Sequence, residues 1–399
     1  MNFSSDSTLR WVRAIHHLSS LERASASEGE RAAAEVIADE LRALGCETEI
    51  ETERAHGTYW WPIGLANIAA AAAAALALAH KSRRARFGAA VLGAAAASTL
   101  WDDLAQGHRW LRRVLPKRST HNVVARTGDP GARRTIVLIA HHDAAHSGLV
   151  FHPALGRLGP TIAPRVHERS SHTTPILFAV WLGPVAIAVG AALGVKKLQR
   201  AGMALALGAS AAMADIGRSP VVPGANDNLS AVGVLLAVAE ALESEPVRGA
   251  TVLLVSTGSE ESFSEGMSAF LARHGAELDP ADTEVLCLEC LGGETLSVLE
   301  GEGMLRMRDY PPELRDALAD AADAAEVTIA RGLRSVAATD ALVAMRAGYP
   351  VATLASVDAT KLPRNYHWPT DVPDALRWQT IEDAIAVCEW FVRLRASGR

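Results

Sequence analysis

Histidine and acidic residues gather in five short segments of this sequence. Each segment alone has an ordinary structural explanation, such as a packed histidine or an aspartate in a turn. Two imidazoles and three of the carboxylates together make a donor set that suits two divalent cations sharing one carboxylate. Nitrogen and oxygen donors favour zinc, with cobalt or manganese as substitutes. The segments are AHHDA with His141 and Asp143, GANDNLSA with Asp227, GSEESF with Glu260 and Glu261, CLECLGG with Glu289, and NYHWPTD with His367.

Local spacing separates neighbouring side chains in two of these segments. In an extended chain, His141 and Asp143 lie on one face and His142 on the other. His141 and Asp143 can therefore face one site together. The adjacent Glu260 and Glu261 point in different directions in any regular backbone. One of them can bind metal while the other faces a substrate as a base.

Short apolar runs before these segments predict the strands that position them. The runs TIVLIA, TVLLVST, EVLCLECL and YPVATLAS are β-rich, whereas the segments between them have helical periodicity. This alternation predicts an α/β fold with a mixed, largely parallel β-sheet flanked by helices in three layers. Ligand sites in such sheets lie at the carboxyl ends of the strands, where the histidines and acids fall. The predicted helices include SEGERAAAEVIADELRALG, AVGVLLAVAEALES, MSAFLARHG, PPELRDALADAADAA and TIEDAIAVCEWFVRLR.

Two pairs of apolar segments interrupt this pattern. Residues 59–79 are uncharged, open with three aromatic residues and are about long enough to cross a bilayer. A basic stretch separates them from residues 87–101, and residues 174–195 and 201–214 repeat the arrangement. We expect inserted transmembrane helical hairpins, with about four hydrophobic helices and the lipid bilayer as a partner. An alanine-rich helical cap or dimer face is the alternative, because the second members are short and alanine contributes little to insertion.

Charge counting leaves the side of the membrane undecided. The positive-inside rule would place both hairpin loops in the cytoplasm, but the segment after the first hairpin is equally basic. The loop residues are Lys81, Arg83, Arg84, Arg86, Lys196, Lys197 and Arg200, and the later ones are Arg109, Arg112, Arg113, Lys117 and Arg118.

The hairpins divide the remaining chain into three pieces that we expect to form one discontinuous domain, residues 1–57, 118–172 and 218–399. The hairpins occupy residues 58–117 and 173–217. Each insertion must return the chain to the side that it left, which two helices per insertion satisfy.

Composition excludes some partners. The net charge of −6 gives no reason to expect nucleic acid. Four cysteines are too few and too scattered for a disulfide framework. Cys287 and Cys290 lie in an apolar run, which favours a core position over a redox or zinc-knuckle role. The oligomeric state stays open.

The order of the chemical segments resembles the M28 family of metallopeptidases. The order is H-x-D, then G-A-N-D-N-x-S, then E-E with a glycine five residues beyond, then an acid followed by glycine, then Y-H. The resemblance covers almost all of the chain outside the hairpins. It implies a zinc-peptidase-like fold and two Zn²⁺ ions per chain.

The resemblance also assigns roles to residues. It implies that Asp227 bridges the two ions and that Glu260 is the general base. Tyr366 would help to hold the oxyanion, although a packed aromatic residue is an equal alternative. The implied ligands are His141, Asp227, Glu261, Glu289 and His367, and the implied supports of ligands and loops are Asp143, Asp340 and Asp371.

Three features depart from the family pattern. Glu289 stands where aspartate is usual, and its extra methylene would alter the coordination or the metal preference. Phe263 replaces the usual glycine after the paired acids, which would reshape a specificity pocket. The second hairpin lies between His141 and Asp227, where the family needs only a short loop.

The expected reaction is hydrolysis of a peptide bond through a metal-activated water, and the resemblance suggests exopeptidase action of the aminopeptidase type. Acyl transfer of the glutaminyl cyclase type, with one zinc, is a first rival. A membrane-anchored binding protein that lacks catalysis is a second rival. The complete set of acids argues against both.

Overall fold

The computed structural model describes residues 9–398, and its centre is a nine-stranded sheet. The strand order is β1-β2-β4-β3-β5-β9-β6-β7, and β8 pairs with β6. The strands are β1 Glu47–Ala55, β2 Arg118–Gly128, β3 Arg134–His141, β4 Ala250–Thr257, β5 Thr283–Glu289, β6 Thr295–Glu302, β7 Arg308–Asp309, β8 Ala330–Ser335 and β9 Val351–Val357.

Strand direction confirms a mixed sheet with a parallel centre. Strands β4, β3, β5 and β9 run parallel to their neighbours in that order. Strand β2 is antiparallel to both β1 and β4, and β6 is antiparallel to both β9 and β7. Because parallel strands end at one edge, the carboxyl ends of the four central strands meet there.

Helices cover both faces of the sheet, as the strand pattern predicts. Ile136 and Leu138 of β3 join a core beneath five helices, whereas the alternate residues Val137 and Ile139 join a second core on the opposite face. The strands are therefore apolar on both faces, as in other sheets that helices cover twice. The first face carries α1 Arg10–Ser19, α2 Glu28–Ala43, α10 Ser230–Ser244, α12 Pro312–Ala324 and α14 Trp378–Ala396, and the second carries α11 Glu265–His274 and α13 Asp340–Arg346.

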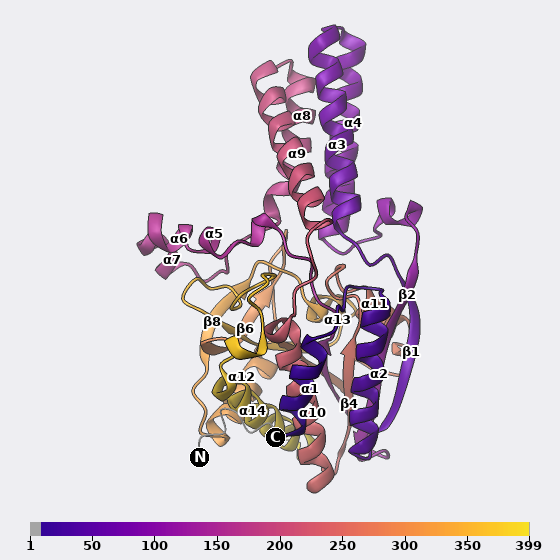
Figure 1. The fold of residues 1–399 in the computed structure, drawn as a ribbon, viewed down its shortest axis with the longest axis vertical. Coiled ribbons are helices and arrows are strands. Elements are labelled where there is room, and N and C mark those ends of the chain that lie inside the picture. The colour runs from indigo at the N-terminus through magenta and orange to yellow at the C-terminus, as the bar shows by residue number, and fades with distance from the viewer. Residues whose placement is uncertain (1–8, 399) are drawn as a thin grey trace.

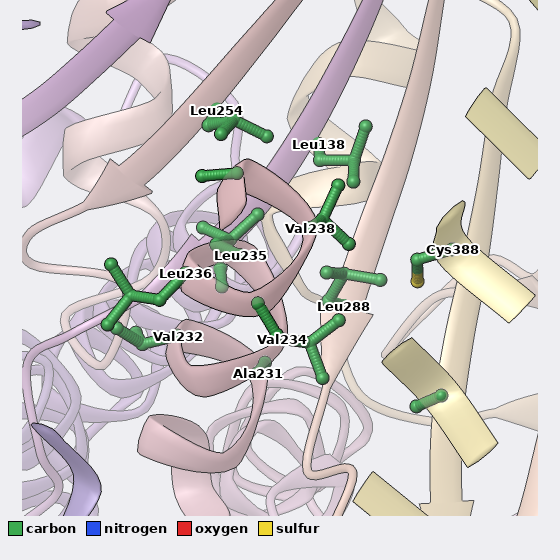
Figure 2. Packing of buried hydrophobic residues seen from close by; sticks show 14 of the residues in the cluster. Leu138, Ala231, Val232, Val234, Leu235, Leu236, Val238, Leu254, Leu288 and Cys388 are labelled. Atoms are coloured by element: carbon green, nitrogen blue, oxygen red, sulfur yellow. The ribbon is translucent and has the colours of Figure 1, made fainter. Parts of the chain in front are cut away.

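Helix α10 is the central helix of the first core. Val234 and Val238 lie against Leu138, Leu254 and Leu288 of three neighbouring strands (Figure 2). Burial of each such side chain contributes roughly 2 kcal/mol. This helix is apolar on nearly all sides because protein surrounds it.

Four further helices project together from the carboxyl edge of the sheet (Figure 1), and we call them the bundle. A glycine allows close approach at the α8–α9 contact, since a Cβ on Gly183 would lie 2.6 Å from the Ala206 nitrogen. The bundle comprises α3 Trp60–His80, α4 Arg83–Leu104, α8 Leu182–Leu193 and α9 Lys196–Ile216. The far ends of the two helix pairs lie side by side, because Arg86 Nε donates to the Ala191 carbonyl at 3.2 Å.

The expectation of about four membrane-crossing helices is not supported. Among the described residues, two helices are long and apolar enough to cross a membrane, residues 60–80 and 225–244. The second includes α10 and is 89% buried, so it is a core helix. Helix α8 has 12 residues and spans only about 18 Å. Helices α4 and α9 do not pass the same test, because charged residues lie near both ends of each of them.

Several elements lacked a clear sequence signal. Helix α1, strand β2 and the strands β6 to β8 were not predicted. Three short helices also come after the first histidine segment, α5 Pro153–Gly156, α6 Leu158–Ile162 and α7 Pro164–Arg169. All four cysteines are buried and free, as the composition predicts.

Candidate metal centre

The carboxyl edge of the sheet brings the candidate ligands together. His141 is the last residue of β3 and Glu289 the last of β5, while Glu260 and Glu261 come shortly after β4. Asp227 comes from a turn, residues 225–229, that has a non-helical backbone at Asp227 and Asn228 and leads into α10. His367 lies in the loop between β9 and α14. Five separate segments thus converge on one buried point.

Asp227 lies between the two histidines. Its Oδ1 is 3.3 Å from His141 Nε2, and its Oδ2 is 3.3 Å from His367 Nε2. Each histidine also faces further acids. His141 Nε2 is 3.8 Å from Glu289 Oε2 and 3.9 Å from Glu260 Oε2, and His367 Nε2 is 3.1 Å from Glu261 Oε2. Each imidazole thus has one oxygen of Asp227 and at least one glutamate beside it.

These donors fit divalent cations. Ligand atoms of His141, Asp227 and Glu261 lie within 4.8 Å of one another. Two buried oxygens, Asp227 Oδ2 and Glu261 Oε1, have no hydrogen-bond partner. An unpaired buried carboxylate oxygen is unfavourable unless a cation compensates it. The nitrogen and oxygen donors suit zinc, and the residues present therefore fit such ions.

Cys290 adds a thiol, although its apolar neighbours in the sequence indicated only a core position. Its Sγ lies within 4.8 Å of ligand atoms of Asp227 and Glu289. Burial raises the pKa of this thiol well above its usual range, and the carboxylates of Asp227 and Glu289 raise it further. The side chain is therefore a neutral thiol beside the acids.

Charge in the centre is strongly unbalanced. Burial raises the pKa of Glu260 and of Glu289 well above the usual range, and His141 opposes the shift in both cases. Burial acts to lower the pKa of His367, but the neighbouring Glu261 and Asp227 overcome it and raise the pKa to about 10. Protein charges alone leave the acids in excess, so the cluster attracts cations.

Asp143 links the first histidine to the paired glutamates. Its Oδ1 lies 3.4 Å from His141 Nδ1, and its two oxygens accept the backbone N–H groups of Glu260 at 3.0 Å and Glu261 at 3.1 Å. Ser25 Oγ donates to it at 2.6 Å. His142 points away from the centre and lies 3.0 Å from Ser256 Oγ. The carboxylate of Asp143 therefore fixes two ligand segments relative to each other.

Asp371 supports the turn that carries Asp227. Its carboxylate accepts the backbone N–H groups of Asn226 at 2.8 Å and of Asp227 at 3.1 Å. Burial raises the pKa of Asp371 to about 7. On the other side of the turn, Asn228 Nδ2 donates to the Leu288 carbonyl at 2.9 Å and its Oδ1 accepts the Cys290 N–H at 2.8 Å.

The asparagines beside Asp227 were not singled out in the sequence. Asn226 Oδ1 accepts the Gly292 N–H at 2.8 Å, so both asparagines bind the segment after Glu289. Their signal was the pattern N-D-N before an apolar helix. A second unpredicted residue is Arg23, which is fully buried and donates to the His142 carbonyl at 2.8 Å.

Asp340 lies on a third side of the centre. It opens α13 and accepts a hydrogen bond from the Thr257 hydroxyl at the end of β4. Burial raises its pKa to about 6, and His141 opposes this shift. Its Oδ1 has no hydrogen-bond partner. Asp340 thus holds the end of β4, just before Glu260 and Glu261.

An apolar cavity of about 150 Å³ opens beside the ligands. Tyr366 lines it and stacks on His367 with the ring centroids 3.9 Å apart. Phe263, the residue in place of the usual glycine, also lines it and stacks on Tyr59 at 5.1 Å. Residues near the bundle form much of the wall, and no local sequence pattern indicated their convergence. They include Tyr59, Phe151, Ile176 and Leu177.

Comparison with known proteins finds one family match. Residues 210–392 match the family model described as Peptidase family M28. This range contains Asp227, Glu260, Glu261, Glu289 and His367, and it excludes His141. No curated protein matches the chain by sequence.

Solved structures show a similar fold at low sequence identity. A glutaminyl cyclase from Fimbriiglobus ruber is 12% identical, with a TM-score of 0.55 over 96% of this chain and 94% of that chain. An aminopeptidase from Aneurinibacillus sp. strain AM-1 is 13% identical, with a TM-score of 0.55 over 96% and 92%. BSAP, a zinc aminopeptidase from Bacillus subtilis, is 12% identical, with a TM-score of 0.53 over 96% and 93%. Residues 210–392 are therefore similar to peptidase family M28, and the chain has a mixed α/β fold like that of zinc aminopeptidases.

Proposed function

We propose that this protein is a zinc-dependent peptidase that removes residues from the free N-terminus of peptides. The observation that supports it most is the division of the centre by Asp227, whose two oxygens face separate pairs of histidine and glutamate. We propose His141, Asp227, Glu261, Glu289 and His367 as ligands of two zinc ions, with Asp227 shared. When bound, the ions would act as Lewis acids and lower the pKa of a water molecule.

Glu260 is the proposed general base. Its Oε2 lies 3.9 Å from His141 Nε2, so it borders the ligands, and it lines the cavity where a substrate would lie. It would take a proton from water and return it to the leaving amine. Its raised pKa favours the first transfer, because a buried carboxyl group holds the proton more firmly than an exposed one.

Tyr366 is the proposed oxyanion partner. Its phenol belongs to the cavity wall, and its ring is fixed between His367 and Phe151. Burial raises the pKa of this phenol well above its usual range, so the group keeps its proton and can donate a hydrogen bond. Such donors are effective when they are placed before the charge develops.

Glutaminyl-cyclase-like acyl transfer is a second candidate, because glutaminyl cyclases also share this fold. The presence of both histidines and three acids around one point favours two cations and therefore hydrolysis. A non-catalytic binding protein is the third candidate, and the unpaired carboxylate oxygens argue against it.

Metal analysis combined with peptide digestion tests the proposal. We expect close to two zinc ions per chain and release of N-terminal residues from free peptides but not from acetylated ones. One ion with cyclisation of N-terminal glutamine would replace the proposal by acyl transfer. Glu260→Gln should lower kcat by roughly 10²- to 10⁴-fold while zinc content is unchanged. Glu294→Gln is the control, since Glu294 is half-exposed and faces Arg364.

We also propose that residues 1–57, 118–172 and 218–399 form one catalytic domain.

A further proposal is that the outer face of the bundle contacts a lipid bilayer. Helix α3 spans about 31 Å, close to the thickness of the hydrocarbon core of about 30 Å. Large apolar side chains are exposed on its outside, and soluble proteins rarely expose such patches without a partner. They include Trp61, Leu65, Ile68 and Leu76, with Phe87, Val91 and Leu92 on α4.

Vesicle flotation tests the contact with lipid. The purified protein should float with vesicles of phosphatidylcholine and phosphatidylglycerol. The triple change of Leu65, Ile68 and Leu76 to serine should reduce flotation severalfold. The control changes Ile162 and Val166 to serine, because they are more exposed than the three α3 residues but lie outside the bundle. Equal flotation of the triple variant and the wild-type protein would exclude a lipid contact through α3.

A further inference from the structure

A buried group of side chains joins the base of the bundle to the segment that carries the proposed base. This segment, residues 259–265, lies just after β4 and contains Glu260 and Glu261. The residues that approach it come from the end of α4 and the turn after it. They are Asp103, Gln106, Arg109 and Arg112, and the proposed chemistry uses none of them.

Arg112 is the centre of this group, and its side chain is completely buried. Its Nε and Nη2 donate to the two oxygens of Asp103 at 2.6 Å and 3.0 Å. Its Nη1 donates to the Ser262 carbonyl at 2.7 Å, directly after the proposed ligand Glu261. The guanidinium carbon also lies 5.1 Å from the Phe263 ring centroid. Arg112 therefore holds both the backbone and a side chain of the segment.

The backbone of this segment needs such support. Ser259, Phe263 and Ser264 have φ values of 52°, 70° and 55°, in the left-handed region that L side chains rarely adopt. Such conformations persist where surrounding contacts determine them. Glu30 holds Ser259 at the start of the segment, and the base of the bundle holds its middle, since Arg109 donates to the Phe263 carbonyl next to the bond that Arg112 makes.

A second path reaches the proposed base itself. Gln106 Nε2 donates to Ser264 Oγ at 3.4 Å, and Ser264 Oγ donates to Glu260 Oε1 at 3.3 Å. Two hydrogen bonds thus separate the end of the first insertion from the carboxylate that would move the proton. Because Ser264 holds one oxygen of Glu260, the insertion also limits how this side chain turns.

We infer that Arg112 is a positioning residue, which ties the first insertion to the backbone of the Glu260–Glu261 segment and so sets the geometry of the metal centre. The inference rests on the proposed function for its kinetic part. Its metal-binding part stands independently, because zinc affinity is measurable without turnover. The insertion would then be required for the site and not merely attached beside it.

The test replaces Arg112 and Asp103 together, while Glu265, which lies 3.7 Å from Arg112 Nη1, keeps its hydrogen bonds from the His56 and Gly57 N–H groups and from Ser262 Oγ. Arg112→Met combined with Asp103→Leu removes the hydrogen bond to the Ser262 carbonyl and fills the same volume with apolar side chains. Proteins often tolerate such a replacement of a buried ion pair. We expect zinc affinity, measured by competition with a chelator, to fall by roughly 10- to 100-fold, the usual effect of losing a support of metal ligands. In the full-length protein, kcat should fall by a similar factor with KM nearly unchanged.

Two further variants separate positioning from general stability. Arg86→Gln is the control, because Arg86 donates to the Ala191 carbonyl within the bundle, far from the segment. It should leave zinc affinity and kcat unchanged. If the double variant does not fold, Gln106→Leu replaces it, and kcat should fall while the melting temperature is retained. Unchanged zinc affinity and kcat in a folded double variant would overturn the inference, as would equal losses in Arg86→Gln. Absence of peptidase activity in the wild-type protein would reject the proposed function but would not affect the zinc-affinity result.

Discussion

Protonation of Glu265 should lower the free energy of unfolding, and the contacts of its carboxylate set the size of the loss. This carboxylate accepts hydrogen bonds from the His56 N–H at 2.9 Å, the Gly57 N–H at 3.0 Å and Ser262 Oγ at 2.7 Å. Its Oε1 lies 2.6 Å from His56 Nδ1, and its Oε2 lies 3.7 Å from Arg112 Nη1. Every one of these contacts favours the ionised form.

The pKa of Glu265 gives the size of the effect. Burial acts to raise it, but the His56 hydrogen bond and the charge of Arg112 overcome burial and lower it from 4.5 to about 2. A pKa that is 4.5 in the unfolded state and about 2 in the folded state corresponds to roughly 3 kcal/mol in the free energy of unfolding. Because the folded state holds the proton less tightly than the unfolded state, this stability is present above pH 4.5. It declines as the pH falls from about 4.5 to about 2.

Unfolding by urea across a pH series measures this contribution. At pH 7 we expect Glu265→Gln to lower the free energy of unfolding by about 3 kcal/mol relative to the wild-type protein. The difference should shrink to about half near pH 3, as the pH falls below the pKa of the unfolded carboxyl group. Glu28→Gln is the control, because Glu28 is exposed and paired only with Arg31, and it should have no measurable effect. A Glu265→Gln difference that is small at pH 7, or constant from pH 7 to pH 3, would refute the calculation.

Three other predictions concern the metal centre and its cavity. Removal of metal by a chelator should lower the melting temperature and abolish peptide hydrolysis, because ligands that bind only the folded state stabilise it. Added zinc should restore both. No change in melting temperature would contradict a buried metal site. Asp371→Asn should weaken zinc binding by roughly 10- to 100-fold, because the carboxylate accepts the backbone N–H groups of Asn226 and Asp227. Chelator competition measures the zinc affinity, and wild-type affinity in this variant would contradict the proposed role. Phe263→Ala should raise the relative kcat/KM for peptides with a bulkier apolar N-terminal residue by roughly tenfold. A series of peptides that differ in the N-terminal residue measures this preference. An unchanged order of preference would show that Phe263 does not limit the cavity.

Local sequence patterns predicted the elements that carry the candidate ligands. The run TIVLIA corresponds to β3, and TVLLVST to β4, because buried central strands are continuous apolar runs. Ser27 accepts the Glu30 N–H at 3.2 Å and so begins α2 where the pattern places its start. The convergence of ligands followed from one general rule, that parallel strands end at the same edge.

The same reasoning failed where partners are distant in sequence. Strand β2 has no alternating pattern, because both of its faces are covered: Val123 and Ala125 join the first core, and Val124 packs against the second. Arg112 was counted only among basic residues, yet its partners Asp103 and Ser262 enclose it completely. Hydropathy identifies apolar segments but does not distinguish a segment in a bilayer from one in a protein core. Residues 225–244, which include α10, are long and apolar enough to cross a membrane, yet 89% of this stretch is buried inside the protein.

Sheet topology explains why the bundle and the metal centre are neighbours. Strand β1 is antiparallel to β2, and β2 is antiparallel to β4, so β1 runs in the same direction as the central strands. The helix pair α3 and α4 lies between the end of β1 and the start of β2, and the pair α8 and α9 comes after the end of β3. Both therefore leave and return at the edge where the ligands lie, and Tyr59 and Ile176 consequently become part of the cavity wall. A movement of the bundle against the sheet would change this wall and the Arg112 contacts before it reached His141 or Glu289, which the strands themselves hold.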